Sequence, residues 1–179
     1  MAGRRRNSSS YRAASSMSSF DRRTFLISLA ALTGCGFSPA YGPGGAGALL
    51  RGKVDIDAPW DRESYNLNKR LTEQFGPSET PLYRLTYKIS TSESQVGITR
   101  DQEILRYHVE GQVNYTLLNI ATGQPLIARY VSSFTSYSAT GSSVDTLTAS
   151  RDAYARLMVL LADQMVSQII TLATPTPAE

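Results

Sequence analysis

From Leu105 to Leu117, apolar and polar residues alternate without interruption. The odd-numbered positions carry Leu, Tyr, Val or Gly, whereas the even-numbered positions carry Arg, His, Glu, Gln, Asn and Thr. Successive side chains of a strand point to opposite faces, so this segment predicts a long strand with one dry and one wet face. It therefore requires a sheet that is covered on one face only.

Three shorter segments predict further strands. Apolar and polar residues alternate over 50–57 and again over 83–90, and a loop is expected from 91 to 101. The sequence Ala-Thr-Gly-Gln at 121–124 is typical of a hairpin turn and leads into a strand over 125–137. The side chains expected to face inward from that last strand are Leu126, Ala128, Tyr130 and Phe134, and those of its hydroxyl-rich outer half are Ser132, Ser133, Thr135, Ser136 and Ser138.

Two segments have helical periodicity. Asp61 is a predicted N-cap for a short amphipathic helix that Gly76 and Pro77 would close. A longer helix is predicted from about Asp145 to Leu172. The residues expected on the apolar sides of these helices are Leu67, Leu71 and Phe75 in the first, and Tyr154, Leu157, Leu161, Met165, Ile169 and Leu172 in the second.

The predicted order is β-α-β-β-β-α, which belongs to the α+β class. A strand-helix-strand start implies a parallel crossover, and the three later strands should form a meander. Because the sheet has only one dry face, both helices should pack there. We expect a two-layer sandwich with a mixed four-stranded sheet.

The positive charge of the chain lies almost entirely before Cys35. Six of the 18 Lys and Arg residues precede it, but only one of the 15 Asp and Glu residues does. The remainder carries 12 basic and 14 acidic residues and so has a formal net charge of −2. A basic surface for nucleic acid is therefore not expected.

The N-terminal segment is typical of a lipoprotein leader. Arg22 and Arg23 precede a short apolar run over 25–32, and the sequence Leu-Thr-Gly-Cys then ends at Cys35. This motif is the lipobox of bacterial lipoproteins, and the run is too short to span a bilayer. We expect cleavage before Cys35 and acylation of its thiol, the only one in the chain.

These features give the expected organisation. Residues 1–34 are a cleaved signal peptide whose true start is either Met1 or Met17, and the general and twin-arginine export routes both remain open. Residues 35–47 are a Gly/Pro-rich tether, 48–173 one domain, and 174–179 a disordered tail.

No catalytic, metal or cofactor site is expected. The single histidine, His108, lies on the wet face of its strand. The carboxylate pairs Asp55 with Asp57 and Asp101 with Glu103 are interpreted as solvated charges. The segment 47–54 resembles a nucleotide-binding P-loop, but Val54 follows the lysine where Ser or Thr is needed, and the segment enters a strand.

Three segments together resemble the lipopolysaccharide-assembly lipoprotein family, LptE (also called RlpB). They are Leu32–Gly42, Ile98–Tyr107 and Ser133–Thr140, the last preceding the long helix. The resemblance extends over the mature chain from Cys35 to about Leu172. That family has a β-α-β-β-β-α order similar to the one predicted here.

The resemblance implies a non-enzymatic outer-membrane lipoprotein on the periplasmic side. Its expected protein partner is a β-barrel of the LptD family, which it plugs and helps to assemble. It is also expected to contact lipopolysaccharide, and outer-membrane lipid through acylated Cys35. The family contacts lipopolysaccharide through basic residues, and Arg100 matches the one between the second and third strands. A second basic residue, expected between the last strand and the long helix, has no match over 138–150. The alternative function is an envelope lipoprotein that carries a small amphiphile, or a scaffold, without a barrel partner.

Overall fold

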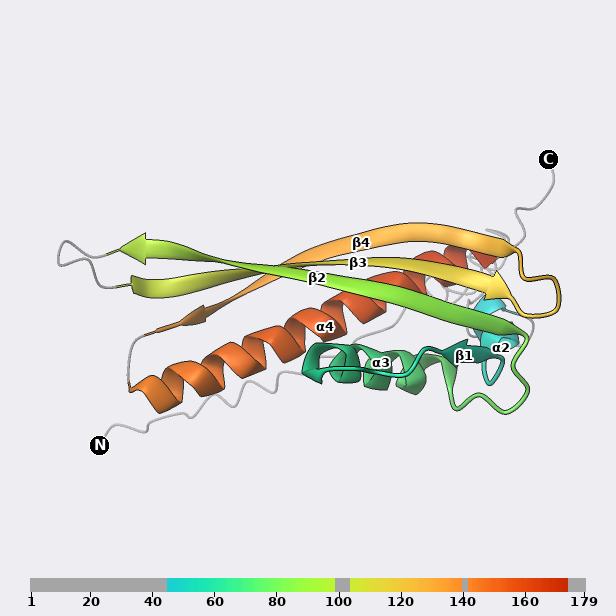
Figure 1. The fold of residues 1–179 in the computed structure, drawn as a ribbon, viewed down its shortest axis with the longest axis horizontal. Helices are drawn as coiled ribbons and strands as arrows, with labels where there is room; N and C mark the ends of the chain where they lie inside the picture. The colour runs from blue at the N-terminus through green and yellow to red at the C-terminus, as the bar shows by residue number, and fades with distance from the viewer. Residues whose placement is uncertain (1–44, 99–103, 140–141, 174–179) are drawn as a thin grey trace, which may run out of the picture. The chain divides into compact units, whose positions relative to one another are not determined.

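A computed structural model describes residues 45–98, 104–139 and 142–173, which all belong to one compact unit over 39–179. Four strands form one sheet in the order β1-β2-β3-β4 (Figure 1). Strands β1 and β2 are parallel, and the β2–β3 and β3–β4 pairs are antiparallel. The elements are α2 (Ala46–Leu50), β1 (Val54–Ile56), α3 (Arg62–Phe75), β2 (Tyr83–Ile98), β3 (Ile104–Asn119), β4 (Pro125–Ser138) and α4 (Ser143–Ala173).

The helices lie on one face of the sheet, so the predicted two-layer α+β architecture is confirmed (Figure 1). Helix α4 packs against β3 and β4, and α3 packs against α4 and β1. On β3, Val109, Val113 and Tyr115 are buried as predicted. The core contributed by α4 consists of Ala153, Leu157, Met158, Leu161, Ala162, Met165, Val166, Ile169 and Ile170.

Helix α4 is long and apolar enough to cross a membrane, by length and composition alone. Its buried side chains pack into this domain, and 44% of its most apolar stretch is buried there. A helix in the core of a domain can be equally long and apolar. The hydropathy of α4 is therefore explained by its place in the core. Leu172, predicted to share the apolar side, is instead 48% exposed near the end of the helix.

The ends of α3 follow the sequence prediction. The Asp61 carboxylate accepts a hydrogen bond from the Ser64 backbone N–H at 2.7 Å, and the Ser64 hydroxyl accepts one from the Asp61 N–H at 2.9 Å. This capping box satisfies donors that the first turn leaves unpaired. The helix ends at Gly76, whose N–H donates to the Thr72 carbonyl. Leu67, Leu71 and Phe75 are all buried.

The predicted strand over 50–57 is mostly wrong. Only Val54–Ile56 form β1, while Leu50 ends helix α2. Gly52 separates the two because it has a positive φ of 72°, a conformation that side chains disfavour. Its N–H donates to Phe75 and its carbonyl accepts from Glu79 and Thr80. These tertiary contacts turn the chain where apolar alternation predicts an extended strand.

The predicted loop over 91–101 is wrong for its described part, because β2 continues to Ile98. Thr91 pairs with Gly111 and Val96 with Arg106, so ladder hydrogen bonds to β3 hold this segment in the sheet. Residues 91–96 are exposed. Alternation in hydropathy reports burial, and it therefore does not reveal a strand that is polar on both faces.

Candidate functional site

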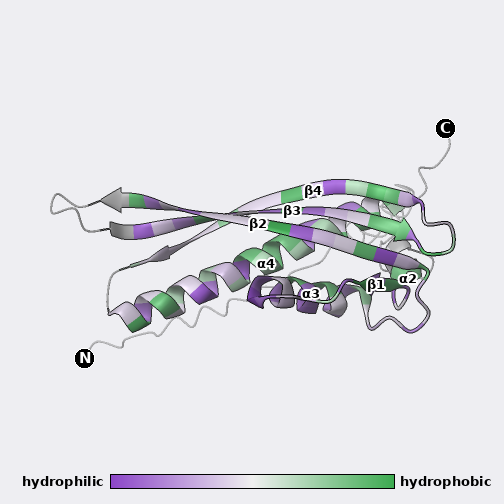
Figure 2. Cartoon of the chain, viewed as in Figure 1, coloured by the Kyte–Doolittle hydropathy of each residue, from purple (hydrophilic) through white to green (hydrophobic). Residues whose placement is uncertain are grey.

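The face of the sheet opposite the helices is not covered by any described element (Figure 1). The register places even-numbered residues of β2, β3 and β4 on this open face. Most are polar, and the strands are largely pale, of intermediate hydropathy, along the middle of the sheet (Figure 2). The open face comprises Arg84, Thr86, Lys88, Ser90, Ser92, Ser94 and Val96 from β2, Arg106, His108, Glu110, Gln112, Asn114, Thr116 and Leu118 from β3, and Ala128, Tyr130, Ser132, Phe134, Ser136 and Ser138 from β4.

The prediction that Tyr130 and Phe134 face inward from β4 is wrong. Tyr130 and Phe134 are 63% and 64% exposed on the open face, whereas Val131 and Tyr137 are buried. A register shift next to the β3–β4 turn pairs Leu118 with Pro125 but Leu117 with Ile127. One extra residue on β4 therefore sets which face each later side chain takes.

Alternation along β4 divides its hydroxyl-bearing residues between the two faces. Ser132, Ser136 and Ser138 belong to the open face as predicted, whereas Ser133 and Thr135 lie on the helix side. The Thr135 hydroxyl donates to the Ala153 carbonyl of α4 at 3.0 Å. This contact helps to hold β4 against the helix.

The charged groups of the open face are of mixed sign. Arg84 forms an ion pair with Asp55 at 3.1 Å. The His108 ring lies 3.6 Å from the Glu110 carboxylate and 4.8 Å, centroid to centroid, from the Phe134 ring. This face therefore suits a polar neighbour that accepts a few aromatic contacts.

Two shallow hollows interrupt the open face. One, of about 430 Å³, is lined by Ser90, Gln112, Ser132 and Phe134 among others. The other, of about 510 Å³, is lined by Thr86, Lys88, Asn114, Thr116 and Tyr130 among others. Both are open to solvent, so they fit side chains of a partner better than they enclose a small molecule.

Hydrogen bonds and ring stacking of a tyrosine cluster connect the long β2 and β3 strands to α4. The hydroxyls of Tyr137 and Tyr154 donate to the two oxygens of the Glu93 carboxylate at 3.1 and 3.3 Å. Burial raises the pKa of both tyrosines, and the Glu93 carboxylate acts in the same direction. The rings of Tyr107 and Tyr137 stack at 5.1 Å. These contacts support the strands that lead into the β2–β3 loop.

A third hollow, of about 610 Å³, lies where α3 crosses α4. Its cation Arg70 donates to Asp163 at 2.8 Å and to Glu73 at 3.3 Å. These hydrogen bonds raise the pKa of Arg70 above its usual value. The guanidinium is thus engaged in joining the two helices, and we assign this hollow a structural role.

The two residues singled out by the sequence, Cys35 and Arg100, lie outside the described residues, as do Asp101 and Glu103. Of the others, His108 is half-buried on the open face, and Asp55 is paired with Arg84. The P-loop-like segment contains most of α2 and ends at the first residue of β1, so its lysine does not open a helix. No group of three or more potential metal ligands occurs within 45–98, 104–139 and 142–173. Tyr130 and Phe134 were missed because the sequence pattern placed them in the core.

Comparison with known proteins gives one family and several similar folds. The profile of the LptE family, described as lipopolysaccharide-assembly, matches residues 52–169. A lipoprotein from Caulobacter crescentus CB15 is 14% identical, with a TM-score of 0.61 over 74% of this chain and 98% of that one. Lipoprotein B from Nitrosomonas europaea is 11% identical, with a TM-score of 0.53 over 69% and 84%.

Rare lipoprotein B from Shewanella oneidensis is 10% identical, with a TM-score of 0.51 over 66% of this chain and 92% of that one. At these identities the structural likenesses establish the fold. No curated protein matches the chain by sequence.

Proposed function

The chain belongs to the LptE family of lipopolysaccharide-assembly proteins, and on that premise we propose that its mature form is an outer-membrane lipoprotein that plugs a β-barrel of the LptD family. In this role it assists assembly of the barrel and delivery of lipopolysaccharide to the outer leaflet. The proposal assigns no enzymatic activity to the chain.

The proposed mature protein begins at an acylated Cys35 after removal of residues 1–34. Residues 35–47 then tether a domain over 48–173 to the periplasmic side of the outer membrane. The lipobox and the absence of any other thiol in the sequence support this assignment.

The observation that supports the plug role best is the open face. It runs along three strands of 14 to 16 residues and is polar except for a few exposed apolar side chains. The lumen of an outer-membrane barrel is polar as well. We propose that the open face, with Tyr130 and Phe134, packs against the lumen wall.

Arg100 is the proposed contact with lipopolysaccharide. In the sequence it lies between β2 and β3, at the position that matches a basic residue of the family. A guanidinium can bind a lipid A phosphate through two parallel hydrogen bonds. Arg106, exposed near the start of β3, provides a matched cation for comparison.

Photocrosslinking in cells tests the plug role. A photoreactive phenylalanine analogue replaces Tyr130 on the open face or, as a control of similar exposure, Tyr65 on α3; these side chains are 63% and 59% exposed. We expect the Tyr130 position to give a crosslink to one large outer-membrane barrel, and the Tyr65 position to give a weaker one.

Equal crosslinks from both positions would contradict the assignment of the open face as the barrel contact, but they would remain consistent with the plug role. The absence of any barrel crosslink, together with normal barrel assembly in depleted cells, would favour the carrier or scaffold. The hollows described above are open rather than enclosed, and this favours the plug over an amphiphile carrier.

A further inference from the structure

Exposed aliphatic side chains gather at one end of the described domain, which we call the α2 end. There α2, the start of β2, the β3–β4 turn and the last turn of α4 lie side by side (Figure 1). Apolar residues are prominent at the ends of β3 and β4 beside α2 (Figure 2). The side chains concerned are 47–54% exposed and comprise Leu49, Leu82, Ile120, Leu126 and Leu172.

Contacts place four of these five residues, all except Leu49, at this end. The Ile120 N–H donates to the Leu82 carbonyl at 3.0 Å, and the Leu82 N–H donates to Lys53 at 2.9 Å. Leu126 directly follows Pro125, which pairs with Leu118. Leu172 and Arg129 line a common hollow. Several half-exposed aliphatic side chains around one end are unfavourable in water and mark a contact surface.

The chain itself indicates what this surface contacts. The described residues begin at Gly45, immediately before α2, and Cys35 is ten residues upstream. Ten residues span at most about 36 Å when fully extended. An acyl group on Cys35 therefore keeps the start of α2 within about 36 Å of the bilayer.

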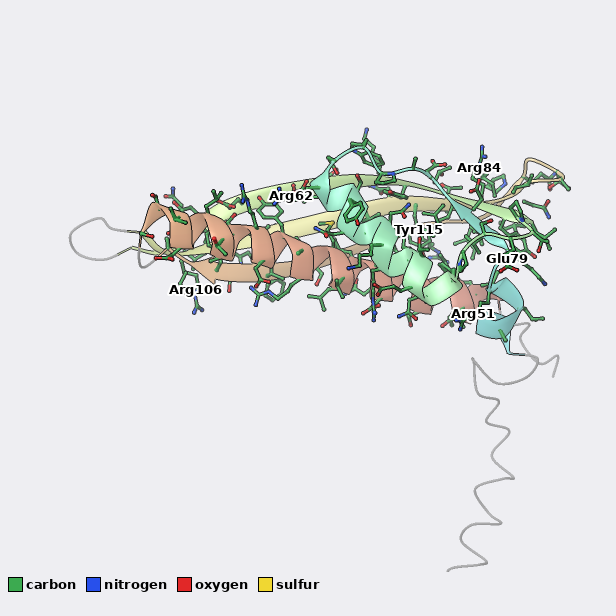
Figure 3. The ribbon with its side chains drawn as sticks, turned by 90° about the horizontal axis from the view of Figure 1, so that it is seen from below. Arg51, Arg62, Glu79, Arg84, Arg106 and Tyr115 are labelled. Carbon is green, nitrogen blue, oxygen red and sulfur yellow. The ribbon has the colours of Figure 1, made fainter. Side chains whose placement is uncertain are left out.

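The charges at the α2 end fit a membrane surface. Arg51, Lys53 and Arg129 form no ion pair with any described residue. Glu79 is an exposed acid at this end, where it lies near Arg51 (Figure 3). Long basic side chains can lay their apolar stems on lipid while their charges reach the headgroups, and anionic lipids attract them.

The opposite end of the domain also exposes apolar side chains, namely Val96, Val144 and Leu147. The 31 residues of α4 separate the two ends by about 46 Å. Arg106 lies at that far end, whereas Arg51 and Glu79 lie at the α2 end (Figure 3). The far end has no short connection to the lipidated cysteine, so apolar exposure alone does not place it at the bilayer.

We propose that the α2 end is a second membrane contact, which inserts its aliphatic side chains into the boundary between headgroups and acyl chains beside the Cys35 anchor. The contact applies to the lipoprotein before it engages a barrel. It orients the domain with α2 against the bilayer and the β2–β3 loop away from it. The proposal rests on the acylation of Cys35 included in the proposed function.

A pair of single-cysteine variants tests this contact. Ile120 and Val96 are 47% and 48% exposed at opposite ends of the sheet, so Ile120→Cys and Val96→Cys form a matched pair. Each mature lipoprotein is labelled with a polarity-sensitive fluorophore and reconstituted, without a barrel, into vesicles of phosphatidylethanolamine and phosphatidylglycerol. We expect a shift to shorter emission wavelength, and quenching by spin-labelled lipid, for the probe at 120 only.

A second measurement removes the anchor. The mature chain with Cys35→Ser is mixed with the same vesicles, with and without Leu82→Ser and Ile120→Ser. We expect residual partitioning that falls roughly fivefold for each replaced aliphatic side chain. Circular dichroism establishes that each variant is folded, and Val96→Ser is the control that should leave partitioning unchanged.

The outcomes separate this inference from the proposed function. Equal emission and quenching at positions 120 and 96 would overturn the membrane contact, even with Cys35 acylated. Labelling of an unmodified Cys35 would instead overturn the lipidation, while quenching at 120 and partitioning of the Cys35→Ser chain would still support the contact.

Discussion

At the scale of single residues, the open face owes its character to a few side chains. Tyr130 and Phe134 each keep more than half of their surface in water, although they belong to a strand whose other face is packed under α4. His108 partly shields the Phe134 ring. Aromatic side chains in such a setting provide large contact areas at low entropic cost, which suits a partner surface.

Arg100→Glu should weaken binding of lipopolysaccharide while leaving the fold and the barrel association intact. Replacing a charge-assisted contact by a repulsive one should lower the affinity by roughly tenfold or more. Binding of the purified mature protein to lipopolysaccharide measures the effect, and Arg106→Glu is the control for a general change in charge. Equal losses in both variants would remove the specific role of Arg100.

At the scale of elements, the central contact is that of α4 on β3. Gly111 lies in the buried row of β3, where an added Cβ would stand 2.9 Å from Leu157 Cδ2 and 3.1 Å from Leu161 Cδ1. Both leucines are fully buried, and buried side chains have little room to move. The absence of a side chain at Gly111 thus allows α4 to approach the sheet closely.

Gly111→Ala should lower the free energy of unfolding by about 1–3 kcal/mol, because the two leucines must shift in a packed core. The neighbouring Gln112 is exposed on the open face, so Gln112→Ala should change stability by less than about 0.5 kcal/mol. Chemical denaturation of the mature domain provides the measurement. Similar effects at both positions would mean that α4 adapts to the extra methyl group.

At the scale of the whole molecule, three parts of the surface have different proposed contacts. The open face would meet the barrel wall, the β2–β3 loop the lipopolysaccharide, and the α2 end the membrane. The acylated N-terminus would link the domain to the bilayer in which its partner is assembled. The proposed lipid on Cys35 is the main link to that location, and the residues from Cys35 onward carry a formal net charge of −2.

Cys35→Ala should abolish acylation and leave an unprocessed precursor, because this thiol is the proposed acceptor of the lipid. Mass spectrometry and membrane fractionation measure both effects. Ser38→Ala, just beyond the lipobox, should be processed normally. Detection of an unmodified Cys35 in the membrane-bound wild-type protein would contradict the prediction.

The sequence alone determined the elements whose signal is local. The alternation of β3, the Asp61 cap of α3 and the apolar side of α4 predicted their positions, since burial and capping leave a periodic pattern in the residues themselves. Because the two predicted helices had to cover the single apolar face of the sheet, the two-layer α+β fold was the expected arrangement. The lipobox likewise predicts lipidation of Cys35 from adjacent residues, and this stays a prediction because Cys35 lies outside the described residues.

Tertiary structure decided what depends on pairing and register. The extension of β2 to Ile98 comes from hydrogen bonds to β3, and the turn at Gly52 from contacts with residues distant in sequence. One extra residue after the β3–β4 turn moved Tyr130 and Phe134 from the predicted core to the open face. Both sets of β4 residues contain apolar side chains, so only the register imposed by β3 and α4 could determine which set is buried.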